Sequence, residues 1–189
     1  TSVILTDMFP SLKNNVIDFL KVRAAWGQTG NDADVYRTLA YYIPDHISSG
    51  YGYLDIVDFI IQHGSNIERN LEELYRRVAF YIIIGNADDH FRNHGFLLTE
   101  KGWELSPAYD INPTTSEQQS LLINRSTNEA DLGLLLDAAP DFMISQNTAK
   151  SIIDSIKTAM ASWRTEAKRF SLPQRDIDTF GPRIDKWLK

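Results

Sequence analysis

The chain of 189 residues contains no cysteine. Disulfide bonds and thiolate metal sites are therefore excluded, and because such a chain suits a reducing compartment, we expect a cytoplasmic protein. Long apolar runs are also missing. The longest, residues 78–84, is far shorter than the ~20 residues that span a bilayer, so we expect no membrane partner.

An excess of positive charge is missing as well. The chain has 25 acidic and 19 basic residues and a net charge of −6, which argues against a general nucleic-acid binder, so we expect no direct nucleic-acid contact. Its 43% hydrophobic and 23% charged residues are typical of a globular protein. Because no break in composition divides the chain, residues 1–189 are interpreted as one domain.

Hydrophobic periodicity predicts a mainly α fold with one small β-hairpin. Helices are predicted at 11–26, 35–42, 53–63, 70–84, 131–138 and 146–170, and a last segment from Pro173 packs back on them. The helix 70–84 is apolar all round in its second half, which indicates a central, buried position. Segments 95–98 and 103–105 predict the hairpin, and a short strand is expected at 121–123.

A dense group of polar residues follows the predicted helix 70–84. Within nine positions the chain places Asn86, Asp88, Asp89, His90, Arg92, Asn93 and His94. Each polar group that is buried needs a hydrogen-bond partner, so a cluster of this density is costly to fold. Such clusters often bind a metal or a phosphate, or transfer a proton, and this one is the first candidate for a functional site.

The spacing of three of the polar residues is informative. Asn93 lies five residues after Asp88, and Asp110 lies seventeen residues further on, behind the predicted hairpin. Protein kinases place a base Asp, a metal-binding Asn and a metal-binding Asp in this order. Asn93 and Asp110 offer the oxygen ligands that Mg²⁺ prefers, and Asp88 would orient an acceptor hydroxyl. The alternative is three ordinary turn residues; their common spacing around a hairpin favours function.

The neighbouring residues leave several roles open. His90 is expected to support the loop, although a general base or a metal ligand has the same chemistry. Arg92 would either contact a phosphate or balance the carboxylates, and Asp89 would either face solvent or fix the loop. Asp88, Asp89, His90 and His94 together also suit a metal-dependent phosphohydrolase, which is the main rival chemistry.

The two motifs resemble those of the HipA-like serine/threonine kinases, the toxins of bacterial persistence modules. The family loop Asn-x-Asp-x-His-x-Lys/Arg-Asn is matched by Asn86, Asp88, His90, Arg92 and Asn93. The Ser-Pro-x-Tyr-Asp turn of the family is matched by Ser106, Pro107, Tyr109 and Asp110. The resemblance is firm over residues 53–115, and the composite of both motifs is far more specific than either alone.

The resemblance implies a kinase-like C-terminal lobe that uses ATP and Mg²⁺. Asp88 would be the catalytic residue, Asn93 and Asp110 the metal ligands, and Asn86, His90 and Arg92 would support the loop or contact phosphate. The family phosphorylates cytosolic proteins such as aminoacyl-tRNA synthetases and pairs with a helix-turn-helix antitoxin.

The family's N-terminal lobe carries a nucleotide-covering loop and a phosphate-contacting Lys, and neither is found here. We therefore expect the missing lobe to be supplied in cis or in trans. The alternative is a non-catalytic binding module derived from this lobe.

Overall fold

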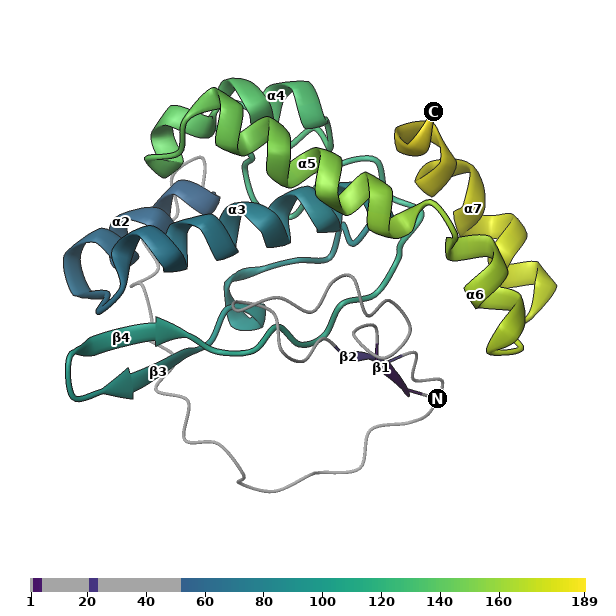
Figure 1. The fold of residues 1–189 in the computed structure, drawn as a ribbon, viewed down its shortest axis with the longest axis horizontal. Coiled ribbons are helices and arrows are strands. Elements are labelled where there is room, and N and C mark those ends of the chain that lie inside the picture. The colour runs from purple at the N-terminus through teal and green to yellow at the C-terminus, as the bar shows by residue number, and fades with distance from the viewer. Residues whose placement is uncertain (1, 5–20, 24–51) are drawn as a thin grey trace.

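The computed structural model describes residues 2–4, 21–23 and 52–189, and in these ranges helices dominate (Figure 1). Two antiparallel sheets of two strands each complete the described part. The elements are β1 Ser2–Ile4, β2 Lys21–Arg23, α2 Tyr53–His63, α3 Ile67–Ile84, the 3-10 turn η2 Phe91–Asn93, β3 Phe96–Thr99, β4 Gly102–Leu105, α4 Leu132–Asp137, the 3-10 turn η3 Ala139–Phe142, α5 Gln146–Met160, α6 Trp163–Arg169 and α7 Gln174–Leu188.

Helix α3 is the centre of the fold. It contacts α2, α4, α5, α7 and β4, and Figure 1 shows it between the α4–α5 layer and the hairpin. Its second half is buried on all sides, because Val78 to Ile84 are apolar around the whole circumference. The prediction of a central buried helix is confirmed, and the helix begins three residues earlier than expected, at Ile67.

The hairpin of β3 and β4 is fixed to the corner between α2 and α3. Gly102 has a φ of 131° and lies against the backbone of that corner, where a side chain would collide with the carbonyl of His63. The amide of Ser65 donates to the carbonyl of Trp103 at 3.0 Å. The predicted hairpin is therefore confirmed, and its position relative to α3 is set by backbone contacts.

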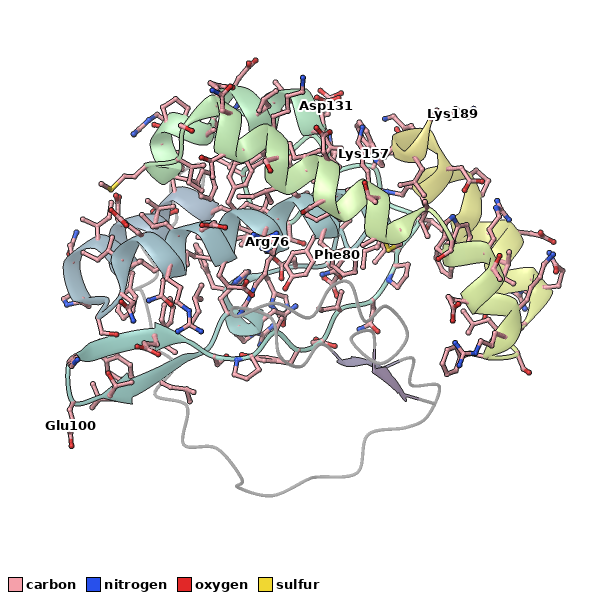
Figure 2. The ribbon with its side chains drawn as sticks, viewed as in Figure 1. Arg76, Phe80, Glu100, Asp131, Lys157 and Lys189 are labelled. Carbon is pink, nitrogen blue, oxygen red and sulfur yellow. The ribbon has the colours of Figure 1, made fainter. Side chains whose placement is uncertain are left out.

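Helix α5 covers α3 on the opposite side from the hairpin. Side chains fill the space between the two helices (Figure 2), and the phenol of Tyr75 donates to the carbonyl of Leu135 at 3.1 Å. The ring of Phe142 packs edge-on against Tyr75 at a centroid distance of 5.3 Å.

None of the helices in the described ranges is long and apolar enough to cross a membrane.

The predicted helix at 11–26 is wrong at residues 21–23, and the rest of it lies outside the described residues. Lys21–Arg23 form strand β2, which pairs with Ser2–Ile4 in antiparallel register. Pairing between segments so far apart in sequence overrides local periodicity. The predicted helix at 35–42 lies outside the described residues.

Two further predictions needed correction. The expected helix 146–170 is two helices, because the chain turns at Ala161 and Ser162 so that the indole of Trp163 can donate to Asp185 of α7 at 2.9 Å. The expected strand at 121–123 is one isolated bridge, in which the carbonyl of Leu122 accepts from the amide of Tyr53 at 3.0 Å.

The side chain of Asn70 connects α3 to the hairpin and offers a test. Its oxygen accepts from the amide of Leu105 at 2.9 Å, and its Nδ2 donates to the carbonyl of Asn66. Asn70→Ala leaves the amide of Leu105 without its acceptor, whereas the carbonyl of Asn66 still accepts from the backbone amide of residue 70. We expect the substitution to lower the free energy of unfolding by about 1–3 kcal/mol in urea titrations. Gln62→Ala, at an exposed position of α2, is the control and should change it by less than about 0.5 kcal/mol. Equal changes in the free energy of unfolding for the two variants would refute the role of Asn70 in connecting α3 to the hairpin.

Candidate active site

The polar loop begins where α3 ends, at Gly85. This residue has a φ of 78°, and its amide donates to the carbonyl of Tyr81 at 2.9 Å. The left-handed conformation stops the helix and is favourable only for glycine. The amide of Asn86 also donates to Tyr81 at 2.9 Å, so the first residues of the loop are tightly held against the helix end.

Asp88 and Asn93 are joined within the loop. The amide nitrogen Nδ2 of the buried Asn93 donates to the backbone carbonyl of Asp88 at 3.3 Å. The carboxylate of Asp88 is exposed. The amide oxygen of Asn93 accepts no hydrogen bond from the rest of the described chain, so it remains available to a ligand. The loop thus presents one exposed carboxylate and one fixed amide oxygen.

The turn that carries Asp110 lies on the same loop. Two hydrogen bonds flank this residue: the phenol of Tyr109 donates to the carbonyl of Arg92 at 2.6 Å, and the amide of Asn112 donates to Oδ1 of Asn86 at 3.2 Å. Asp110 is exposed and has a φ of 55°, which is uncommon for a residue with a side chain. The contacts on both sides stabilise this unfavourable conformation.

Arg77 of α3 holds the start of the same turn. Its Nη2 donates to the carbonyl of Ser106 at 2.7 Å, and its Nε pairs with Glu73 at 2.7 Å. All three residues are buried, and the pair is charge-assisted. Helix α3 therefore positions both halves of the site, the polar loop through its C-terminal end and the Ser106–Asp110 turn through Arg77.

Asp89 is the most deeply buried acid of the site. Its Oδ2 accepts a hydrogen bond from the phenol of Tyr53 at 2.8 Å and lies 2.7 Å from Nε2 of His94. The side chains of Asp89 and His94 are 1% and 2% exposed. Of the two roles expected for Asp89, the structure shows the loop-fixing one: the contact with His94 closes the loop around η2, and the contact with Tyr53 ties it to α2.

Several tyrosines around Asp89 are held in the neutral form. Burial raises the pKa of Tyr53 well above its ordinary value, and the charge of Asp89 raises that pKa further. Burial and Asp89 also raise the pKa of Tyr81. Burial raises the pKa of Tyr109, with a further contribution from Asp110. Tyr53 is therefore a reliable donor, whereas the buried hydroxyl of Tyr81 has no hydrogen-bond partner among the described residues.

The remaining predicted site residues are placed as follows. His90 precedes η2, and its carbonyl accepts from the amide of Asn93 at 2.8 Å, while its ring atom Nδ1 is enclosed without a partner in the described chain. The side chain of Arg92 is exposed and pairs with no carboxylate of the described ranges.

The cluster required by a metal phosphohydrolase is not found. Asp89 and His94 bind each other in the interior, whereas Asp88 faces solvent. Across the part of the chain that the structure describes, no group of three or more His, Asp or Glu side chains could hold a metal ion. A magnesium site of the kinase type needs fewer protein ligands and is not subject to this requirement.

Sequence reasoning missed the supporting residues Tyr53 and Arg77 as parts of the site. Tyr53 is 36 positions from Asp89, and Arg77 is 29 positions from Ser106. No local pattern connects residues so far apart. Asp89 and His94 are close together in the motif, which is a local indication of their contact. The motif nevertheless suggests only a metal-ligand role for His94.

Comparison with known proteins places the chain among kinase-related sequences. The family described as HipA-like C-terminal domain matches residues 25–163. A "Putative kinase" of Haemophilus influenzae is 28% identical over 93 residues, which are 49% of this chain and 23% of that protein. The HipA–HipB–operator DNA complex of the Shewanella oneidensis MR-1 toxin–antitoxin system contains a chain that superposes with a TM-score of 0.57 at 18% identity, over 75% of this chain and 35% of that one.

The matched relatives are much longer than this chain, which spans about a quarter of the kinase and about a third of the toxin–antitoxin protein. At 18% identity the structural match shows a shared fold, in agreement with the predicted helical lobe of a kinase-like enzyme. The family match at residues 25–163 includes both the polar loop and the Asp110 turn.

The contact between Tyr53 and Asp89 can be tested against a second buried tyrosine. Tyr53→Phe removes a donor from a buried carboxylate, and we expect it to lower the free energy of unfolding by about 2 kcal/mol. Tyr81→Phe removes a hydroxyl that has no partner in the described chain, so it should be neutral or slightly stabilising. Urea unfolding of both variants measures these changes. A larger decrease in the free energy of unfolding for Tyr81→Phe than for Tyr53→Phe would contradict the hydrogen bond from Tyr53 to Asp89.

Proposed function

This chain belongs to the family of HipA-like C-terminal domains, and we propose that it is the catalytic lobe of a Mg-ATP-dependent protein serine/threonine kinase of the HipA type. The observation that carries the proposal is the attachment of the Asp110 turn to the loop of Asp88 and Asn93 by the hydrogen bonds of Tyr109 and Asn112. The segments that carry three residues with kinase-like spacing are thereby connected by hydrogen bonds.

Asn93 and Asp110 would bind Mg²⁺, and their chemistry suits this ion. Both offer oxygen ligands. Within the described ranges only Oδ1 of the Asp110 carboxylate takes part in a hydrogen bond, with Nδ2 of Asn112 at 2.9 Å. Bound Mg²⁺ would neutralise charge on the ATP phosphates. The unusual backbone of Asp110 supports this role, because a strained residue that is firmly held on both sides is typical of functional sites.

Asp88 would orient the hydroxyl of the protein substrate. Its carboxylate is exposed, whereas its backbone is fixed by Asn93, so the group is accessible and yet positioned. The two functions are separate: Asp88 acts on the acceptor, and Asn93 and Asp110 act on the nucleotide. Exposed Arg92 is free to contact a phosphate, and Asn86 supports the turn through its Oδ1.

The proposed substrate is a cytosolic protein such as an aminoacyl-tRNA synthetase, with a helix-turn-helix antitoxin as a further partner. The family membership supports both, and the similar chain of known structure is a HipA bound to HipB and operator DNA. Because the chain spans only about a third of that HipA, the N-terminal lobe would be supplied in cis or in trans to cover the nucleotide.

The test is phosphoryl transfer from radiolabelled Mg-ATP to protein by the chain completed with its N-terminal lobe. Asp88→Asn should lower the rate by about 10²-fold or more, because the acceptor hydroxyl loses its orienting carboxylate. Asp137→Asn, an exposed acid at the end of α4, is the matched control and should leave the rate unchanged. A rate that survives Asp88→Asn, or no transfer by the unmodified protein, would refute the catalytic proposal.

A further inference from the structure

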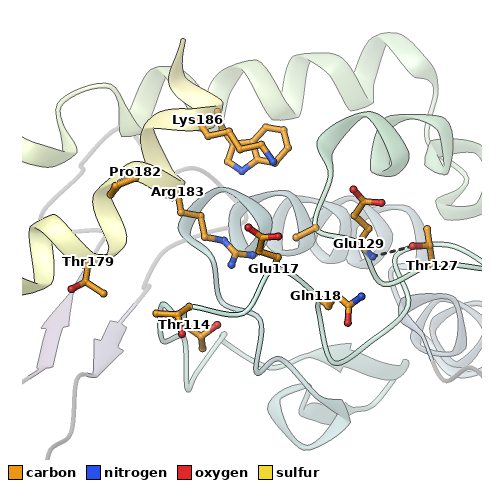
Figure 3. A pocket seen from close by; sticks show the side chains of 12 residues that line it. Thr114, Glu117, Gln118, Thr127, Glu129, Thr179, Pro182, Arg183 and Lys186 are labelled. Carbon is orange, nitrogen blue, oxygen red and sulfur yellow. Dashed lines mark hydrogen bonds between the residues drawn. The ribbon is translucent and has the colours of Figure 1, made fainter.

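A pocket lies between α7 and the chain segment that follows the Asp110 turn (Figure 3). It has a volume of about 630 Å³, within the range of pockets that bind ligands. Helix α7 contributes Arg183, Lys186 and Trp187, and the facing segment contributes Thr114, Glu117 and Glu129, among others. None of these residues belongs to the site of Asp88, Asn93 and Asp110.

The pocket adjoins the polar loop at its first residue, Gly85. Thr114, which lines the pocket, donates to the carbonyl of Gly85 through its amide at 2.8 Å and its hydroxyl at 3.2 Å. The side chain of Arg183 lies over the same glycine, where an added Cβ would be only 2.6 Å from Nε. Two residues that line the pocket, Thr114 and Arg183, therefore contact the turn from which the loop to Asp88 departs.

Arg183 is a half-buried cation without a partner among the described residues. It forms no hydrogen bond or ion pair with any residue of the described ranges, although Arg77 and Arg164 each pair with a carboxylate. Burial lowers the pKa of Arg183, and Glu117 opposes this effect only from a distance. A guanidinium carries five N–H donors, and partial burial of these donors without acceptors is unfavourable. The arrangement favours a ligand that brings the acceptors.

The other charges of the pocket narrow the choice of ligand. Glu117 and Glu129 form no ion pair with described residues, and Lys186 lies over the ring of Trp187 at 4.4 Å. The two glutamates would repel a free phosphate dianion more strongly than a single carboxylate, because the dianion carries twice the charge. A single carboxylate on a peptide suits the guanidinium fork, and the glutamates can accept hydrogen bonds from peptide N–H groups.

The distance to Asp88 sets the position of this carboxylate in the peptide. Three Cα–Cα steps of about 3.8 Å separate Gly85 from Asp88, so the two lie at most about 11 Å apart. An extended peptide covers this distance with about three residues. A substrate whose hydroxyl is at Asp88 can therefore place a nearby side chain beside Arg183.

We propose that the Arg183 pocket binds an acidic side chain of the protein substrate, about two to four residues from the acceptor hydroxyl. This inference rests on the proposed kinase function and adds to it a rule of substrate choice. The pocket selects the substrate by charge, and its contact with the loop at Gly85 limits how far the recognised carboxylate lies from the hydroxyl.

The experiment measures peptide binding to the whole chain by the indole N–H NMR signal of Trp187, which Trp187→Phe assigns. The probes are short alanine peptides with a central serine and one glutamate placed about two to four residues before or after it, each with a glutamine twin. No nucleotide is present, so this result and that of the Asp88 experiment are independent of each other.

We expect at least one glutamate peptide to bind about tenfold or more tightly than its twin, since a charge-assisted hydrogen bond is lost in the twin. Arg183→Gln should abolish the difference, and Arg183→Lys should keep part of it. Arg175→Gln, an exposed arginine of the same helix, is the control and should keep all of it. Equal binding of the twins, a preference that survives Arg183→Gln, or saturation by inorganic phosphate with no gain from a peptide would each overturn the proposal.

Discussion

A polar loop that leaves the end of a buried helix needs hydrogen-bond partners for each of its buried side chains. The carboxylate of Asp89 is the most deeply buried acid of this loop, so it needs them most. The group is fully buried. Its Oδ2 is hydrogen-bonded by Tyr53 from α2 and by His94 from the far end of the loop, whereas its Oδ1 has no partner among the described residues. Removing either partner would leave a buried charge poorly compensated. The conformation of the whole polar loop depends on this arrangement.

The site consequently contains two groups of residues: buried residues that fix the backbone of the loop, and residues whose side chains are exposed. Arg77, Asp89 and Asn93 are buried and make contacts that fix the backbone, whereas the carboxylates of Asp88 and Asp110 face outward. A reactive site requires this division, because an exposed group is precise only when its backbone is fixed by the structure beneath it. Helix α3 provides that support for both halves of the site.

Much of the fold was predictable because its signals are local. The apolar circumference of α3 and the turn between β3 and β4 belong to short segments, and both predictions are confirmed. The pairing of β1 with β2 and the break between α5 and α6 depend on contacts with distant residues, such as Asp185 with Trp163, and no local pattern indicates them. The motif located Asp88, Asn93 and Asp110, whose roles remain predictions, while Tyr53 and Arg77 became visible only in three dimensions.

The central claim is that Asn93 and Asp110 form one magnesium–nucleotide site. Calorimetric titration of Mg-ATP into the chain completed with its N-terminal lobe, repeated with Asp110→Asn, tests it most directly. The account predicts binding by the unmodified chain that Asp110→Asn abolishes, because the substitution removes the only carboxylate among the proposed ligands. Equal affinity of the two proteins for Mg-ATP, or no binding by either, would contradict it.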